Sequence, residues 1–389
     1  MKRFLSLSIG MLLSVCSFAF DIAVPNSNGD TIYYNYINDG TELEVTGFNF
    51  RYTGSITIPT EATYRGRTRK VTRIGEDAFY HCEELTAVTI PLSITIIDGG
   101  AFAGCRSLKS LTIPNSVTKI GRGTFSGCKS LSSISLPSSI DRLESWLFFG
   151  CSSLTTINIP NSVIYIGQRA FNNCTSLTQI IIPNSVKHID GEAFLGCTNL
   201  TKITIPNSVE KIDYCLFKDC NKLTSVTLSN TLSSIEKNAF EGCTSLTSIS
   251  IPNSVTTIGS YAFNGCTRLA SITLSNNVSI IEIGAFQNCI GLKTITIPDN
   301  VTTINDRAFQ NCSNLSSVTI GKSVTRIGKA IFHGCSNLES IISRMDNPCQ
   351  ITEETFSKDI IYNITLHVPS GSIGNYKAAN IWKSFLFIE

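Results

Sequence analysis

Charge is scarce in this sequence. Charged residues make up 15% of the 389 residues, and 31 Lys and Arg against 29 Asp and Glu leave a formal net charge of +2. Proteins that bind nucleic acid neutralise its phosphates with an excess of basic residues, and this composition holds no such excess. We therefore expect no nucleic-acid partner, and charge alone does not indicate which partner the chain has.

Residue types common in catalytic and metal sites are also few. The sequence holds two Trp, three Met and four His, and the histidines show no H-E-x-x-H or similar metal-ligand spacing. His188 lies beside Lys187 and Asp190, but no nucleophile stands in a triad arrangement with them. No glycine-rich phosphate loop follows a strand in the required context. The sequence thus predicts no catalytic residue, no metal site and no cofactor.

Long hydrophobic runs are absent after residue 20, where no apolar stretch approaches the ~20 residues that a membrane-spanning helix needs. Before that point a basic start and an apolar stretch lead to Ser17-Phe18-Ala19, a small-x-small cleavage site. This order is typical of a secretory signal peptide over residues 1–19, with the mature chain beginning at Phe20 or Asp21.

Cys16 leaves a second interpretation of this segment open. A lipoprotein places a cysteine after a short apolar run, but Val15 stands where a small residue is wanted. In either case we expect an exported protein, secreted or held at the cell surface, and the charged start suits bacterial export.

Twelve cysteines recur every 23 residues without a gap. They are Cys82, Cys105, Cys128, Cys151, Cys174, Cys197, Cys220, Cys243, Cys266, Cys289, Cys312 and Cys335. A Phe precedes each by three residues and a Leu follows each by three, so one unit reads L-x-x-I-x-I-P-x-x-V-x-x-I-G-x-x-A-F-x-x-C. A fixed period of this length is the sequence signature of a repeat architecture.

The spacing within one unit predicts one turn of a coil. The alternation Ile249-Ser250-Ile251 indicates a strand with one buried face, and Pro252 ends it because proline cannot donate to a strand ladder. Val255 and Ile258 then cover a second side. Because each turn can bury its apolar residues only against neighbouring turns, we predict a repeat solenoid, rich in β, with short parallel strands, little helix and a cap at both ends.

This unit resembles the BspA-like leucine-rich repeats of bacterial surface proteins, over residues 56–343. The tail also resembles the terminal segment of such proteins, in Leu366-His-Val-Pro369 followed by Tyr376 and by Trp382-Lys-Ser-Phe385. The resemblance implies a right-handed leucine-rich-repeat coil that presents an elongated extracellular surface for adhesion and host interaction. It implies no particular ligand, because one fold serves many functions.

The chain is expected to divide into four parts. These are the signal peptide at 1–19, an N-terminal β-hairpin cap at 20–70, a leucine-rich-repeat solenoid of about 12 repeats at 71–343 and a C-terminal cap at 344–389. Such caps cover the apolar ends that a repeat array would otherwise expose.

Local signals describe the two caps. Asn38-Asp39-Gly40 predicts a turn between strands at 31–37 and 42–48. Around residues 64–67 the chain is longer than the period allows, which predicts a projecting hairpin. In the C-terminal cap we expect a short helix near residues 375–379.

The repeated cysteines are predicted to be buried thiols that pack as small hydrophobic residues. Their Cβ atoms should lie about one strand spacing apart, ~4.8 Å, whereas a disulfide favours ~3.8 Å. Disulfides remain the alternative for an exported protein, and the even spacing offers no zinc cluster. Cys215 and Cys349 lie outside the ladder, and Cys215 is predicted to be partly exposed and reactive.

The outward positions of the L-x-x-I-x-I strands carry hydroxyl groups in turn after turn. Examples are Ser110 and Thr112, Ser271 and Thr273, and Thr294 and Thr296. One interpretation is that Ser and Thr suit an exposed sheet and were copied with the repeats. The others are hydrogen bonding to glycans or to a protein, or ordering of water. Gln179, Ile181 and Lys202 interrupt this ladder, through either a specific contact or sequence drift.

The central repeats are the least uniform part of the array. Their V-x-x-I segments carry basic and aromatic residues where flanking units have Ser or Thr, and a Trp stands where other units have Gly, Arg or Glu. Such residues are favoured interface anchors, although a merely solvated surface is the alternative. The candidate partner-binding residues are Arg142, Trp146, Tyr165, Gln179, Ile181, Lys187, His188, Lys202 and Lys211.

The leading hypothesis for function is a non-enzymatic extracellular binding or adhesion protein. Its repeat surface would face host matrix proteins, glycoproteins or other cells. The alternative is a glycan- or polysaccharide-binding module of the cell envelope that uses the hydroxyl ladder and aromatic residues.

Overall fold

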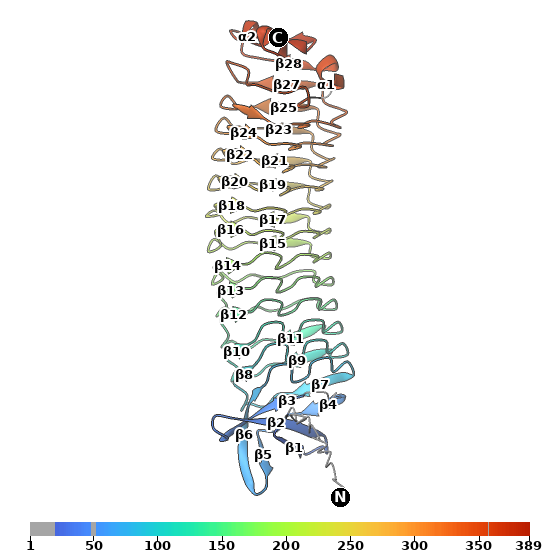
Figure 1. The fold of residues 1–389 in the computed structure, drawn as a ribbon, viewed down its shortest axis with the longest axis vertical. Helices are drawn as coiled ribbons and strands as arrows, with labels where there is room; N and C mark the ends of the chain where they lie inside the picture. The colour runs from blue at the N-terminus through green and yellow to red at the C-terminus, as the bar shows by residue number, and fades with distance from the viewer. Residues whose placement is uncertain (1–19, 48–51, 357) are drawn as a thin grey trace, which may run out of the picture.

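The chain forms a β-solenoid of about 14 turns in a computed structural model that describes residues 20–47, 52–356 and 358–389. The turns stack into a rod with the N-terminus at one end and the C-terminus at the other (Figure 1). Strands of successive turns pair in parallel, and helix within these described ranges occurs only near the C-terminal end. The predicted solenoid of short parallel strands with little helix is confirmed. The predicted signal peptide lies outside the described residues.

The first sheet contains the strands of the L-x-x-I-x-I segments, whose outward side chains make up the ladder face. Its strands are β4 (Gly54–Thr57), β7 (Leu85–Thr89), β9 (Ser110–Thr112), β11 (Ser133–Ser135), β15 (Lys202–Thr204), β17 (Ser225–Thr227), β19 (Ser248–Ser250), β21 (Ser271–Thr273), β23 (Thr294–Thr296), β25 (Ser317–Ile320), β27 (Ser340–Ser343), β28 (Thr365–His367) and β29 (Phe387–Ile388). Along β9, β11, β19 and β23 two exposed hydroxyl residues flank a buried side chain that points into the core.

This first sheet is not continuous along the rod. It is divided into β4 with β7, β9 with β11, β15 with β17, β19 with β21, and a five-stranded piece from β23 to β29. Between β11 and β15 only isolated bridges remain, Asn158 with Ile181 and Gln179 with Lys202. Single backbone hydrogen bonds still cross these interruptions, as from the Thr178 N–H to the carbonyl of Thr155 at 3.1 Å. The interruptions are possible because strands of about three residues make only a few ladder bonds.

The second sheet contains the V-x-x-I segments. Its strands are β6 (Arg67–Ile74), β8 (Ile96–Ile97), β10 (Lys119–Ile120), β12 (Arg142–Leu143), β13 (Tyr165–Ile166), β14 (His188–Ile189), β16 (Lys211–Ile212), β18 (Ser234–Ile235), β20 (Thr257–Ile258), β22 (Ile280–Ile281), β24 (Thr303–Ile304) and β26 (Arg326–Ile327). From β8 onward, paired strands keep a register of one 23-residue period, as between Tyr165 and His188. This sheet is interrupted between β10 and β12 and between β14 and β16, and both interruptions adjoin the central repeats.

The N-terminal cap continues the second sheet. Strands β1 (Ile22–Pro25), β2 (Thr31–Ile37) and β3 (Glu42–Thr46) pair antiparallel, and β3 then pairs in parallel with β6. The hairpin at residues 38–40 is confirmed. The insertion is confirmed as well, because β5 (Glu61–Tyr64) pairs antiparallel with β6 and the pair projects beyond the end of the rod (Figure 1).

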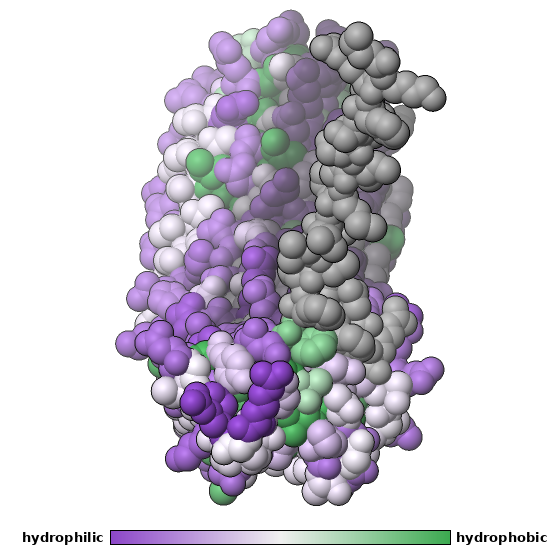
Figure 2. Space-filling model, turned by 60° about the horizontal axis from the view of Figure 1, so that its bottom comes forward, coloured by the Kyte–Doolittle hydropathy of each residue, from purple (hydrophilic) through white to green (hydrophobic). Residues whose placement is uncertain are grey.

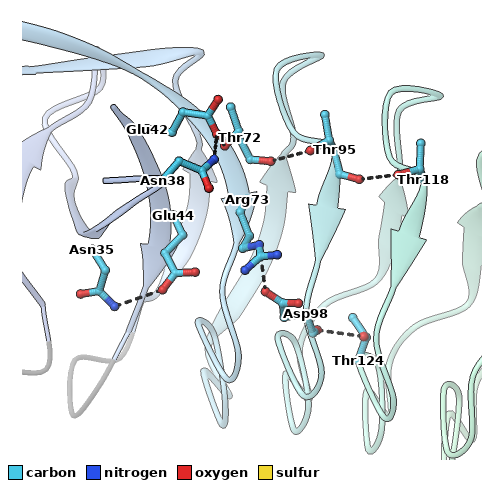
Figure 3. A network of polar contacts seen from close by, with 10 residues as sticks. All are labelled: Asn35, Asn38, Glu42, Glu44, Thr72, Arg73, Thr95, Asp98, Thr118 and Thr124. Atoms are coloured by element: carbon cyan, nitrogen blue, oxygen red, sulfur yellow. Dashed lines mark hydrogen bonds and ion pairs between the residues drawn. The ribbon is translucent and has the colours of Figure 1, made fainter. Parts of the chain in front are cut away.

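Polar contacts join this cap to the first turns (Figure 3). The carboxylate of Glu42 accepts hydrogen bonds from Asn38 and from Thr72 Oγ1, both at 2.7 Å. Thr95 Oγ1 donates to the carbonyl of Thr72 at 3.3 Å, and Arg73 pairs with Asp98 at 3.3 Å. The outer surface of this end is mostly hydrophilic, with small hydrophobic patches (Figure 2). The cap thus covers the first turn and presents a polar end.

The C-terminal cap contains α1 (Lys358–Asn363), α2 (Ile373–Ala378) and the 3-10 helix η1 (Trp382–Ser384). The short helix expected near residues 375–379 is confirmed as α2, whereas α1 and the added strands β28 and β29 were not predicted. Tyr376 and Trp382 are buried, and the hydroxyls of Tyr376 and Ser343 share a hydrogen bond of 2.6 Å. This bond ties the cap to the last repeat strand.

The core is built from repeated columns. Phe rings stack from Phe79 to Phe356, with neighbouring centroids 4.9–6.0 Å apart and ring planes within 20° of parallel. Beside them, each ladder thiol from Cys105 to Cys335 donates to the Phe carbonyl 26 residues earlier, at 3.1–3.2 Å. These cysteines are buried thiols, as predicted. No helix of the described residues is both long and apolar enough to cross a membrane.

Candidate interaction surface

The nine candidate residues lie on two different faces. Arg142, Tyr165 and His188 hold equivalent positions in successive strands of the second sheet. Lys187 lies beside this column, Lys211 begins the next strand, and Trp146 follows the bend after β12. We call these six residues the central patch. Gln179, Ile181 and Lys202 lie instead on the ladder face, so the structure does not bring all nine together.

Stacking and ion pairs order one half of the central patch. The Arg142 guanidinium carbon lies 3.8 Å from the centre of the Tyr165 ring, and Arg142 Nε pairs with Glu144 at 3.1 Å. The Tyr165 hydroxyl donates a hydrogen bond to Asp190 of the next turn. Burial and the neighbouring Asp190 carboxylate raise the pKa of Tyr165 to about 12. Tyr165 therefore stays a neutral hydrogen-bond donor across the physiological range.

An ion pair also holds the side chain of Lys211 in place. Its Nζ lies 3.0 Å from an Asp213 carboxylate oxygen, and this hydrogen bond raises the pKa of Lys211 above its usual value. Lys187 and His188 are exposed, and the second sheet is interrupted directly beside them. A groove of about 510 Å³ opens at this interruption. Its lining includes Lys187, His188, Asp190, Glu210, Lys211 and Ser233.

Trp146 lies between two arginines of neighbouring turns. The guanidinium carbon of Arg169 is 4.6 Å from the centre of its ring, that of Arg122 is 5.9 Å away, and the Phe149 ring is 4.8 Å away. Arg169 in turn makes a two-pronged contact with Glu192, at 2.6 and 3.1 Å, which raises its pKa. The indole Nε1 is buried and has no hydrogen-bond acceptor among the described residues.

Two columns of the solenoid have left-handed backbone, and they differ in composition. One column holds His81, Gly104, Gly127, Gly150, Asn173, Gly196, Asp219, Gly242, Gly265, Asn288, Asn311 and Gly334. Nearly all of these are the residue types that tolerate positive φ best. The other, which we call the bend column, holds Asp77, Gly100, Gly123, Trp146, Arg169, Glu192, Cys215, Asn238, Tyr261, Gly284, Arg307 and Ala330.

Several residues of the bend column have large side chains although their positive φ angles favour glycine. Trp146 has φ 65° and Arg169 has φ 57°, and left-handed backbone costs an L-residue roughly 1–2 kcal/mol. Gly123 and Gly284 show that the fold accepts glycine in this column. The side chains of Trp146 and Arg169 are thus not required by the backbone, and strained positions of this kind concentrate at functional sites.

The interruption residues of the ladder face are well exposed. Ile181 is 82% exposed, and Gln179 and Lys202 are exposed on either side of it. Most other residues of this column are Ser or Thr, although Ile342 also belongs to it, and Ile181 forms no patch with the residues of the second sheet. It is a separate feature of the surface.

The prediction for Cys215 was only half right. Its side chain is partly exposed, as expected from its place in the bend column. Burial nevertheless raises the pKa of its thiol, more than the neighbouring Lys218 lowers it. Because the thiolate is the reactive form, Cys215 is not an activated nucleophile.

The repeat matches a known family along most of its length. The BspA type leucine rich repeat region matches in six copies, over residues 72–200, 187–316 and 267–381. The chain belongs to this family. The family resemblance expected from the 23-residue unit is therefore confirmed. No curated protein matches the sequence.

Three solved bacterial structures share this architecture. A leucine-rich repeat protein of Bacteroides ovatus is 29% identical, with a TM-score of 0.62 over 80% of this chain and 93% of its own. A leucine rich cell surface protein of Faecalibacterium prausnitzii is 30% identical, with a TM-score of 0.58 over 83% of this chain and 95% of its own. The pneumococcal vaccine antigen PcpA is 18% identical, with a TM-score of 0.51 over 95% of this chain and 98% of its own, and shares the fold alone.

Sequence reasoning missed the residues that hold the central patch in place. Arg169, Asp190 and Glu192 were not among the candidates, although the 23-residue period places each one turn from the residue it contacts. Tyr214 was missed for a different reason, because its hydroxyl accepts from Gln168, two turns away, at 2.6 Å. Gly191 leaves room for this contact, since a Cβ there would lie 2.4 Å from the Tyr214 ring. In the described part of the chain no group of His, Cys, Asp and Glu is arranged to hold a metal ion.

Proposed function

We propose that this chain is an exported, non-enzymatic binding protein that docks a protein partner on the central patch. It would be secreted or held at the bacterial cell surface, and its partner would be a host matrix protein, a glycoprotein or another cell. Export is supported by the signal-peptide pattern at residues 1–19, and the surface location by the name of the Faecalibacterium prausnitzii relative.

The observation that carries the proposal is Trp146. Trp and Arg are the residue types most enriched at energetic hot spots of protein interfaces. Here a Trp is held between Arg122 and Arg169 on a backbone that disfavours it. The pre-ordered rings and guanidinium groups lose little conformational freedom on binding, which favours affinity.

The test uses two variants of one column. Residues 20–389, with Trp146→Gly or Tyr261→Gly, are immobilised and exposed to fibronectin, laminin, collagen and mucin glycoproteins in a surface binding assay. Both variants place glycine in left-handed backbone, so both relieve the same strain, but only Trp146 belongs to the central patch. We expect a partner of the unmodified chain to lose at least tenfold affinity with Trp146→Gly and to bind Tyr261→Gly as before.

Two results would contradict the proposal. If the unmodified chain, Trp146→Gly and Tyr261→Gly bound a partner equally well, the central patch would be excluded as the docking site. If the unmodified chain bound none of the four named proteins, matrix proteins and glycoproteins would be excluded as partners.

A further inference from the structure

A second groove lies on the ladder face, away from the central patch. The first sheet is interrupted between β21 and β23, and the groove of about 520 Å³ opens at this interruption. Its sides carry Ser271, Thr273, Thr294 and Thr296, and its far end carries Asn276, Asp299, Asn300 and Arg344. We call this the ladder groove. Its volume lies within the ~300–1,000 Å³ of typical small-molecule sites.

The hydroxyl groups of the ladder groove are available to a ligand. Thr201 Oγ1, in the column beside the ladder, donates to the backbone carbonyl of Thr178 at 3.2 Å, and Thr224 Oγ1 donates to Thr201 at 3.0 Å. In contrast, the hydroxyls of Ser271, Thr273, Thr294 and Thr296 are exposed and have no hydrogen-bond partner among the described residues. The solenoid therefore bonds the hydroxyls of this neighbouring column to its own backbone and leaves the four groove hydroxyls unbonded.

A glycine shapes the far end of the groove. Most turns have Pro where the first strand ends, but here Gly321 stands between the turns of Asp299 and Arg344. A Cβ at Gly321 would lie 2.3 Å from the carbonyl oxygen of Pro298, so any larger residue would push these turns apart. Across this glycine, Arg344 Nη1 reaches an Asp299 carboxylate oxygen at 3.7 Å. The pair closes one end of the groove with a donor group and an acceptor group side by side.

Two asparagines complete the polar end. Asn300 Nδ2 donates to the backbone carbonyl of Asn276 at 2.7 Å, which orients the Asn300 amide and leaves its oxygen unbonded. The side-chain amide of Asn276 is exposed, and both its donor and its acceptor are available. Between the polar sides, Ile272, Leu274 and Pro298 supply apolar surface to the groove.

We propose that the ladder groove binds a short, neutral oligosaccharide. Sugars present vicinal hydroxyl pairs, each of which can donate and accept, together with apolar C–H faces. Amide, carboxylate and guanidinium groups match such pairs with two hydrogen bonds at once, and hydroxyls serve as either donor or acceptor. The Asp299 and Arg344 charges offset each other, which favours a neutral ligand over an anionic one. This site is separate from the docking surface proposed above and does not depend on it.

The test measures saccharide binding by titration calorimetry to residues 20–389. The probes are xylohexaose, cellohexaose, mannohexaose and maltohexaose, each titrated into the protein up to 10 mM. We expect at least one probe to bind. Asn276→Ala and the double variant Thr294→Val with Thr296→Val should each weaken that binding at least tenfold.

The control is a matched pair of hydroxyls on the same ladder. Ser110→Ala with Thr112→Val removes two exposed hydroxyls of β9, outside the groove, and should leave saccharide binding unchanged. Far-ultraviolet circular dichroism of each variant checks that the solenoid is intact. Trp146→Gly should also leave saccharide binding unchanged, so failure of one proposal does not imply failure of the other.

Three outcomes would overturn the assignment. No binding of any of the four probes would exclude the ligand class. Unchanged binding by the Asn276 and Thr294 variants would exclude the groove. Equal loss in the β9 variant would show that the whole ladder, and not this groove, holds the sugar.

Discussion

Arg142 and Tyr165 come from neighbouring turns and stack at 3.8 Å, while the Tyr165 hydroxyl is bonded to Asp190 of the turn after. Three consecutive turns are thereby linked through side chains at the place where the second sheet is interrupted on both sides. These side-chain contacts add to the backbone pairing of β12, β13 and β14, and they also hold a cation and an aromatic ring in fixed positions on the surface.

Replacing Arg142 with Ala should affect binding more than stability. An exposed cation–π contact contributes about 0.5–1 kcal/mol, so urea unfolding should show a loss of that size. Affinity for a partner docked on the central patch should fall at least fivefold in the surface binding assay. Arg326→Ala is the control, since Arg326 holds the same position of the second sheet outside the patch. An equal effect of both variants on binding would count against the patch.

Truncating one ring of the Phe stack should destabilise the rod strongly. Phe217 is fully buried, with ring neighbours at 5.7 and 5.4 Å on either side. Phe217→Ala should lower the free energy of unfolding by about 3–5 kcal/mol, as large buried rings do, measured by urea unfolding followed by circular dichroism. Phe217→Leu keeps most of the volume and should cost clearly less. Comparable losses would mean that the column does not need a filled core at this turn.

Alkaline pH should destabilise the fold through its thiols. Burial raises the pKa of Cys197 and of Cys289 to about 12, against about 8.5 for an unfolded cysteine. The unfolded chain therefore loses these protons first, and the stability that the protonated thiols contribute is lost as pH rises from about 8.5 towards 12. The melting temperature should fall steadily over this window and stay level between pH 6 and 8. Replacing Cys197 and Cys289 with Ala should make the decline shallower, and an unchanged slope would contradict the thiol explanation.

Gly321→Ala should strain the turn beneath the ladder groove. The added Cβ would lie 2.3 Å from the Pro298 carbonyl oxygen, a contact that requires the backbone to move. Overpacking of this kind costs about 1–3 kcal/mol, measurable by urea unfolding. Gly371→Ala is the control, because nothing lies within 4 Å of its added Cβ. If both variants were equally stable, the close approach of the turns at Gly321 would be refuted.

Export should remove the first residues of the chain. Expressed in a bacterial host and recovered from outside the cytoplasm, the protein should begin at Phe20 or Asp21 when its N-terminus is read by mass spectrometry. A lipid-modified N-terminus at Cys16 would establish the lipoprotein alternative instead. Recovery of the full-length chain from the cytoplasm alone would contradict export.

The repeat could be derived from the sequence because its period fixes burial at every position. The 23-residue spacing placed Phe, Cys and the strand residues in inward columns, and each of these columns is buried as expected. The hairpin at Asn38-Asp39-Gly40 was equally accessible, since those residue types specify a turn by themselves. Local chemistry and strict periodicity were sufficient for these elements.

The interruptions of the two sheets could not be derived, because the turns beside them carry nearly the same repeat pattern as turns that pair. The groove beside Gly321 lies at one such interruption and also involves a contact across two turns, between Asp299 and Arg344. The contacts of Trp146 with Arg122 and Arg169 could have been predicted from the sequence. Both arginines lie about one 23-residue period from Trp146, so a search for cation and aromatic pairs at that spacing would have found them. Helix α1 is six residues long and has no repeat or hydrophobic periodicity in the sequence from which it could be predicted.

The fixed register of the solenoid limits how the distance between the central patch and the ladder groove could change during evolution. Because each turn contacts only its neighbours, duplication or loss of one 23-residue unit between residues 215 and 270 would leave every core column continuous. Such a change would move the central patch and the ladder groove relative to each other by one strand spacing, about 4.8 Å, without altering either. The distance between the two proposed sites can therefore change only in steps of one whole turn.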